Sequence, residues 1–212
     1  LSDKVLSDYS DSDYVENAIL LKGKSHFFRR EYDSAKDAFI SLQDSDDIFF
    51  LNETKYWLAL CKWKDLKSQP AINDLKNLLA DTDSEELQSR IYLTLGEIYL
   101  ENKDSDSAFY HLNLGAETSK DRFTREQIYF QIAELSYDKE IYEQALNSYQ
   151  KVLNNSISIN RIRESNLKII QTYRLLGDIE QSKNRIERLL LNEDFSSIKS
   201  DLRLELIKIE LD

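Results

Sequence analysis

The chain has 212 residues, of which 41% are hydrophobic and 32% are charged, and its net charge is −11. Four glycines and one proline are too few for the many turns of a β-sandwich or barrel, or for a glycine-rich nucleotide fold. One cysteine and two histidines allow no internal disulfide and no His-rich metal site. Because an acidic chain repels phosphate, general binding to nucleic acid or to an anionic membrane is disfavoured. The composition is typical of a soluble, mostly helical protein.

The sequence predicts neither a membrane span nor a signal peptide at its start. No apolar run approaches about 18 residues, so we expect no direct membrane insertion. The first residues, Leu1 to Lys4, lack the cationic and long apolar segments of a signal peptide, and the chain contains no methionine. We therefore expect a processed chain or a piece of a longer one.

Three columns of residues recur every 36 or 37 positions and predict five helical hairpins. Small residues form the first column: Ala35, Ala71, Ala108, Ala145 and Ser182. Twelve positions earlier, the second column holds Gly23, Ala59, Gly96, Ala133 and Ile170. Four positions after the first column, the third holds Phe39, Leu75, Leu112, Tyr149 and Ile186. Small residues let two antiparallel helices approach closely, and the large residue one turn later fills the adjacent gap.

The columns place units at about 13–47, 48–83, 84–120, 121–157 and 158–194. Short polar connections within each unit favour antiparallel helix pairs. Residues 1–12 are expected to be the tail of a preceding unit. Residues 195–212 are expected to start a sixth unit or a cap, with a helix over Ile198–Leu211 in which Ile207 takes the place of Ile170. Because one hairpin cannot bury its apolar face alone, we expect residues 1–212 to form a single domain of stacked repeats.

These columns resemble the tetratricopeptide repeat, and the resemblance extends from about Asp13 to Asn192. The best copy carries Tyr92, Leu95-Gly96, Tyr99, Ala108 and Leu112. The resemblance implies an all-α fold, namely a right-handed α-solenoid of about five helical hairpins with partial units at both ends.

Two departures from the family pattern matter. The first-helix tyrosine of the family is replaced by His26, Lys62 and Ser136 in three copies. The period is longer than the family's common period of about 34, so we expect extended loops between hairpins. Long units of this kind are similar to those of bacterial envelope members, and the compartment stays open between the cell envelope and the cytoplasm.

The resemblance also implies that the first helices line a concave surface that binds a partner segment without catalysis. Carrying the family's first-helix positions onto this sequence gives a candidate partner-binding set that is mainly aromatic and acidic, so we expect a protein or peptide partner of apolar and basic character. The alternative that each of these aromatic residues is core stays open. The candidate set is Phe27, Glu53, Tyr56, Leu60, Trp63, Arg90, Glu97, Phe130, Glu134, Tyr137 and Arg174.

No pattern in the sequence predicts an active site, a cofactor or a metal. The glycines form neither a phosphate loop nor a dinucleotide fingerprint. We expect Cys61 to be a small buried apolar residue, His26 to pack at a repeat position, and His111 to be exposed on a helix. The acidic runs 44–47 and 81–86 lack the glycine and terminal glutamate of a calcium loop, and are expected to lie at helix starts.

The sequence therefore predicts a non-enzymatic protein–protein interaction scaffold. The alternative is a structural or assembly segment of a larger envelope or multidomain protein, with no peptide-binding activity of its own. Neither the identity of the partner nor the oligomeric state follows from the sequence.

Overall fold

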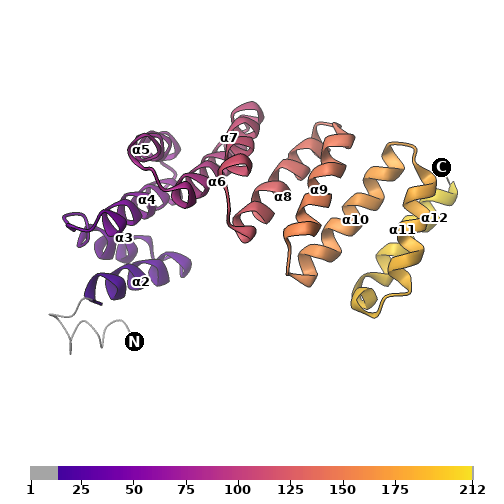
Figure 1. Cartoon of the computed structure of the whole chain (residues 1–212), viewed down its shortest axis with the longest axis horizontal. Coiled ribbons are helices and arrows are strands. Elements are labelled where there is room, and N and C mark those ends of the chain that lie inside the picture. Colours follow the sequence, from indigo (N-terminus) through magenta and orange to yellow (C-terminus); the bar gives the residue numbers. More distant parts are fainter. Residues whose placement is uncertain (1–13, 212) are drawn as a thin grey trace. The chain divides into compact units, whose positions relative to one another are not determined.

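The computed structural model describes residues 14–211, and all regular secondary structure in this range is helical (Figure 1). The expected tail at 1–12 lies outside the described residues. The chain divides into two compact units, residues 1–87 and 88–212. The helices are α2 (Val15–Phe28), α3 (Tyr32–Ile40), α4 (Ile48–Lys64), α5 (Ser68–Asp81), α6 (Glu85–Glu101), α7 (Ser105–Thr118), α8 (Arg122–Asp138), α9 (Tyr142–Asn155), α10 (Ile159–Leu175), α11 (Ile179–Leu190), the 3₁₀ helix η1 (Glu193–Ile198) and α12 (Lys199–Leu211).

Helices that follow one another in the sequence pack against one another within each unit. In the first unit, α2 packs on α3, α3 on α4, and α4 on α5. In the second unit, each helix from α7 to α12 packs on the next one along the chain. Contacts between neighbours in sequence are the pattern that a helical-repeat protein requires, because each hairpin covers the apolar face of the next.

The helix starts follow a period of 37 residues. First helices α4, α6, α8 and α10 begin at Ile48, Glu85, Arg122 and Ile159, and each has 17 residues. The segments that join these helices to their neighbours from α4 to α11 are only three residues long. The expectation of extended loops is therefore wrong here, because the added length of the repeat lies in the helices. A longer segment, 41–47, joins α3 to α4.

The three predicted columns form the core. Every member of the first and third columns is 0% exposed. The close approach that the small residues permit is visible at Gly23, where an added Cβ atom would lie 2.5 Å from Phe39 Cε1. Only glycine fits at this position without moving the Phe39 ring, so the residue type at 23 follows from the packing of α2 on α3.

Each first helix ends in the same left-handed turn. The residue two positions beyond the helix has a positive φ in all five hairpins, and only the last of the five is a glycine, Gly177, with φ 77°. In the third hairpin, Lys103 has φ 62°, and the amide of Asp104 donates to the carbonyl of Tyr99. This bond closes a Schellman motif and satisfies a carbonyl that the helix end leaves open. The positive-φ residues are Arg30, Leu66, Lys103, Glu140 and Gly177.

The helix expected over 198–211 is present as α12, but Ile207 is not buried as Ile170 is. Leu202 and Ile209 are buried in a cluster with Phe195, whereas Ile207 is 52% exposed. Ile170, one period earlier, is buried in the same cluster as Ile186 of α11. Ile170 is covered by α11, the helix that follows it. Among the described residues no helix follows α12, so Ile207 has no such helix to cover it.

Two sequence predictions for single residues were tested by burial. His111 is only 8% exposed, so its predicted exposure is wrong. Its ring stacks on Tyr99 with centroids 5.1 Å apart, and its Nδ1 lies 2.8 Å from the carbonyl oxygen of Ser107. Cys61 is buried at 0% exposure, as expected.

Asp47, in the first acidic run, caps α4 by accepting a hydrogen bond of 2.8 Å from the amide of Phe49.

Candidate protein-interaction face

The candidate residues on α4 are buried in the first unit. Tyr56 is 6% exposed, and Leu60 and Trp63 are each 7% exposed. All three side chains are therefore part of the core, which is the alternative that the sequence left open. Glu53 is also buried, at 4%, where it accepts a hydrogen bond of 3.1 Å from Trp57 Nε1 and pairs with Lys24 at 3.0 Å. A carboxylate that is buried with two donors is satisfied internally.

Aromatic residues of α2 gather around Trp57. Phe27 is half-buried, and its ring lies edge-on to Trp57 with centroids 5.2 Å apart. Phe28, which the sequence analysis did not select, is 74% exposed and contacts both Phe27 and Trp57. The accessible aromatic side chain at this end of α2 is therefore Phe28. Its position beside Phe27 was the only sequence signal for it.

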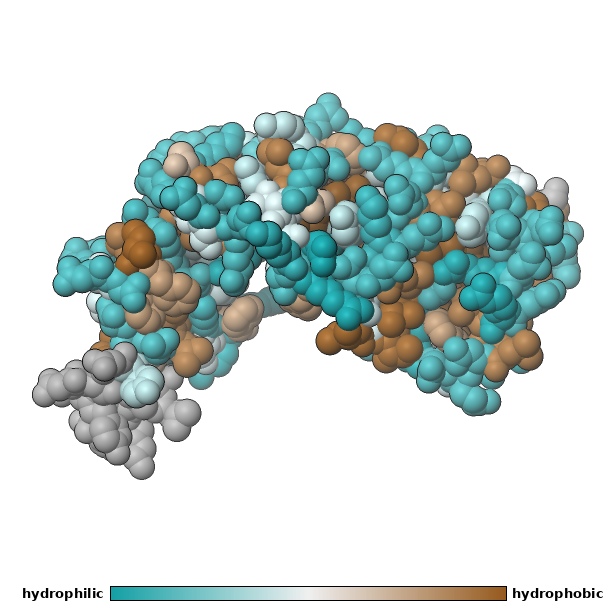
Figure 2. Space-filling view, in the orientation of Figure 1, coloured by the Kyte–Doolittle hydropathy of each residue, from teal (hydrophilic) through white to brown (hydrophobic). Residues whose placement is uncertain are grey.

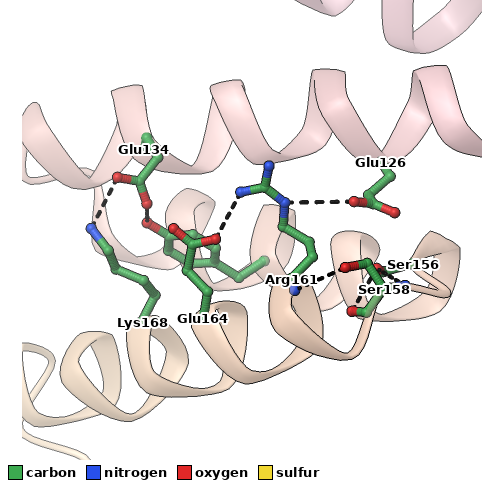
Figure 3. Close-up of polar contacts among 8 residues, drawn as sticks. Glu126, Glu134, Ser156, Ser158, Arg161, Glu164 and Lys168 are labelled. Carbon is green, nitrogen blue, oxygen red and sulfur yellow. Dashed lines mark hydrogen bonds and ion pairs between the residues drawn. The ribbon is translucent and has the colours of Figure 1, made fainter.

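In the second unit, one face of α8 meets one face of α10 (Figure 3). Three candidate residues on α8, together with Glu126, are spaced by three or four residues, so they lie on one side of the helix. The face of α10 opposite them carries two cations and an acid. We call this surface the α8–α10 face, and it comprises Glu126, Phe130, Glu134, Tyr137, Arg161, Glu164 and Lys168.

Arg161 holds one end of the α8–α10 face. Its guanidinium lies 3.7 Å from the ring centroid of Phe130. Its Nη1 donates to Glu164 at 2.8 Å, and its Nε lies 3.5 Å from Glu126 (Figure 3). Glu126 is buried at 5% exposure, whereas the side chain of Glu164 is 50% exposed. Arg161 therefore fixes one buried acid and one accessible acid next to a half-buried aromatic ring.

Lys168 holds the other end. Its Nζ donates to Glu134 at 2.9 Å and lies 4.8 Å from the ring centroid of Tyr137. The Tyr149 hydroxyl donates a short hydrogen bond to the other oxygen of Glu134. Burial raises the pKa of Tyr149, and the acceptor Glu134 raises it further, so this hydroxyl keeps its proton. Glu134 is thus held from two sides, in a fixed orientation.

The same arrangement continues from α10 to α12. Glu205 is buried at 3% exposure, accepts from Gln171 Nε2 at 3.1 Å and pairs with Lys208 at 2.8 Å. Arg174 Nε lies 3.8 Å from the other oxygen of Glu205. The two remaining candidates, Arg90 and Glu97, are half-buried on α6.

The sequence analysis selected only Phe130, Glu134 and Tyr137 from this face. It missed both cations and the other two acids. Arg161 lies 35 residues after Glu126, and Lys168 lies 34 residues after Glu134. The sequence signal for such a pair is an acid on one first helix and a base on the next, separated by about one repeat. The acids of the face are therefore largely neutralised by the chain itself.

Surface and metal chemistry add little to this picture. Small hydrophobic patches break the hydrophilic surface over the part of the chain that carries α8 to α11 (Figure 2). Among residues 14–211, no group of three or more His, Cys, Asp or Glu side chains could hold a metal ion. Within that same range, no helix combines the length and the apolar character that crossing a membrane requires.

Solved structures with the same arrangement of helices are known. MamA of strain AMB-1 is similar at 18% identity and a TM-score of 0.59, over 90% of this chain and 98% of its own. PilW, a type IV pilus biogenesis factor, is similar at 14% identity and 0.62, over 92% of this chain and 86% of its own. A tetratricopeptide-repeat protein of Thermus thermophilus is similar at 18% identity and 0.52, over 93% of this chain and all of its own.

These similarities, together with the 37-residue period of the helix starts, define the fold. The chain is an all-α helical-repeat protein with the tetratricopeptide-repeat fold. Its sequence matches no protein-family model and no curated protein.

Proposed function

We propose that this chain is a non-enzymatic scaffold that binds a segment of a partner protein along its first helices, at the α8–α10 face. The observation that carries the proposal is the fixed arrangement of Phe130, Glu134 and Tyr137 beneath two partly exposed cations. Arg161 and Lys168 have side-chain exposures of 30% and 27%, so a partner can reach them and the groups that they contact.

Preorganisation supports binding at this face. The carboxylate of Glu134 is already oriented before a partner binds, because the Tyr149 hydroxyl donates to one of its oxygens. A surface whose side chains are ordered before binding loses less conformational entropy when the partner arrives. The two half-buried rings offer apolar contact area, which is the usual source of dominant binding energy in protein interfaces.

The chemistry of the face favours a partner segment that is apolar and basic. A lysine or arginine of the partner would compete with Lys168 for Glu134 and for the ring of Tyr137. Partly exposed ion pairs contribute only about 0–1 kcal/mol each, so exchanging one cation for another costs little. The exposed carboxylate of Glu164 would add attraction, and the net charge of −11 would speed the encounter with a basic segment.

The test is a site-specific photo-crosslinker at Tyr137 in the full chain, followed by titration of the purified crosslinked partner. We expect the double variant Phe130→Ala/Tyr137→Ala to weaken binding at least about tenfold, because truncated aromatic anchors cost about 2 kcal/mol or more. Phe123→Ala is the matched control, since Phe123 is 62% exposed on α8 and outside the face. Unchanged affinity in the double variant would contradict the proposal and favour the structural or assembly role.

In the first unit, the aromatic residues that the sequence suggests for a binding test are not suitable, because they are buried. Tyr56→Ala and Trp63→Ala remove buried side chains, so they test stability rather than binding. Phe28→Ala removes the exposed ring on α2 instead, and it is the variant that tests whether the first unit also contacts the partner.

A further inference from the structure

One position of the repeat is occupied differently in α8 than in its neighbours. The fifteenth residues of α6, α8 and α10 are Tyr99, Ser136 and Tyr173, spaced 37 residues apart. Tyr99 stacks on His111, and Tyr173 packs against the core cluster of Ala133, Ala145, Tyr149 and Ile169. Ser136 is fully buried, and its hydroxyl donates at 2.7 Å to the carbonyl of Ile132 in its own helix. The serine side chain is much smaller than the tyrosine ring that α6 and α10 carry at this position.

A pocket of about 590 Å³ opens beside Ser136. It lies within the second unit, between α7 and the turn from α8 to α9, and none of its residues belongs to the α8–α10 face. Its apolar wall includes Tyr110 and Ile141, which are 61% and 48% exposed. The lining residues are Asp106, Phe109, Tyr110, Asn113, Leu114, Glu117, Ser136, Lys139 and Ile141.

The repeat itself indicates what this pocket can hold. Phe109 in the pocket wall lies one period before Leu146, and Ser136 lies one period before Tyr173. Leu146 and Tyr173 both pack against the same core cluster in the next hairpin. Phe109 and Ser136 thus take the repeat positions that Leu146 and Tyr173 take one hairpin further along, and the wall of the pocket has the apolar character that suits a ring.

The charges at the mouth of the pocket are unbalanced. Asp106 pairs with Lys139 at 2.6 Å, which neutralises both groups. Glu117, an exposed residue, also lines the pocket. The mouth therefore carries a net negative charge, which is complementary to a basic side chain.

We propose that the pocket beside Ser136 is a docking site for an aromatic side chain of a partner protein, presented next to a basic residue that pairs with Glu117. The ring enters the pocket between α7 and the turn from α8 to α9 and contacts Phe109, Leu114 and Ile141. An aromatic anchor in a preformed pocket is a common way to concentrate binding energy in one side chain. This surface goes beyond the function proposed for the first helices, because it uses α7, a second helix.

The experiment is a methyl NMR titration of the full chain with p-cresol, which is the tyrosine side chain as a free molecule. We expect saturable shifts of the Leu114 and Ile141 methyl signals in the wild type. Ser136→Tyr fills the pocket from within and should abolish these shifts. Absence of saturable shifts in the wild type, or their persistence in a folded Ser136→Tyr variant, would overturn the proposal.

A second variant serves if Ser136→Tyr does not fold. Tyr110→Ala removes a mostly exposed ring from the pocket wall, so it should leave the fold intact and weaken p-cresol binding at least about threefold. Phe123→Ala is the matched control, because it removes an exposed ring of similar size outside the pocket and should change nothing. Equal affinities for all three proteins would refute the site.

Two short peptides test the charge. We expect acetyl-Lys-Tyr-Lys-amide to bind about two- to fivefold more tightly than acetyl-Glu-Tyr-Glu-amide, which is the range of an exposed ion pair. Glu117→Gln should narrow this ratio. No preference for the lysine peptide would overturn the basic part of the proposal. Glu134→Gln, in the α8–α10 face, should leave both titrations unchanged, so this site and the first-helix site can fail independently.

Discussion

Gly96 and Leu112 are packed so closely that no side chain fits between their helices: a Cβ atom on Gly96 would lie 2.6 Å from Leu112 Cγ. Replacing glycine by alanine within a helix normally stabilises by about 1 kcal/mol. Here the fully buried Leu112 must move, and overpacking costs about 1–3 kcal/mol. We expect Gly96→Ala to lower the free energy of unfolding by about 1 kcal/mol net, measured by urea denaturation.

A double-mutant cycle separates this clash from other effects of the substitution. In a Leu112→Ala background the space is open, so Gly96→Ala should become neutral or stabilising. An equal loss of stability in both backgrounds would show that the contact with Leu112 is not the cause.

The left-handed turns after the first helices predict opposite effects for two substitutions. Gly177 has φ 77° and no atom within 4 Å of an added Cβ, so Gly177→Ala carries only the backbone cost of about 1–2 kcal/mol. Leu66 has φ 62° and is 93% exposed, so Leu66→Gly relieves strain without losing packing. We expect Gly177→Ala to lower and Leu66→Gly to raise the unfolding midpoint in urea. A shift of Leu66→Gly toward lower stability would contradict this explanation.

The core was predictable because it depends on spacing alone. In each hairpin, a residue of the first helix lies twelve positions before a small residue of the second helix, and a large residue follows that small residue by four positions. These spacings put all three on the facing sides of the two helices, and the fixed period repeats the arrangement in each hairpin. The left-handed turns were not predictable in the same way. Lys103 and Glu140 have a positive φ although neither is a glycine, so the residue type does not mark the turn. The positive φ is required only by the hydrogen bonds of the folded turn.

Prediction of the candidate site was weaker for a different reason. The burial of Tyr56 and Trp63 depends on the packing around α4, which no position within a single hairpin specifies. His111 was assigned to the surface because its neighbour Tyr110 suggested an exposed helix side, yet its ring is covered by Tyr99 on the facing helix. Arg161 and Lys168 could be found only by comparing one first helix with the next.

The cap of α8 predicts a dependence of stability on pH. Asp121 Oδ2 accepts a hydrogen bond of 2.6 Å from the amide of Thr124, and hydrogen bonds from Thr124 lower the pKa of Asp121. Because the folded pKa lies below the unfolded value of about 3.9, the cap stabilises fully at neutral pH and is lost as the pH falls below about 4. We expect Asp121→Ala to cost about 1 kcal/mol at pH 7, with the difference shrinking toward pH 2.5.

Urea denaturation across this pH range measures the effect, and Asp121→Asn is its control. Asparagine accepts the same hydrogen bond but does not titrate, so the stability difference between Asp121→Asn and Asp121→Ala should stay constant from pH 7 to pH 2.5. A constant difference between the wild type and Asp121→Ala down to pH 2.5 would mean that the charge of Asp121 has no role in the cap.

The buried thiol of Cys61 predicts slow reaction with thiol reagents. Burial raises the pKa of Cys61 to about 11, and its side chain is 0% exposed. The thiol of the unfolded chain ionises at a lower pH than the buried thiol of the folded chain. The contribution of Cys61 to the free energy of unfolding is therefore full below about pH 8.5 and is lost as the pH rises toward 11. At pH 8 the thiolate fraction alone should make the native protein roughly two-hundredfold less reactive than the protein in urea. Ser41→Cys in a Cys61→Ala background provides an exposed thiol for comparison, and labelling of native Cys61 as fast as this control would show that the thiol is accessible.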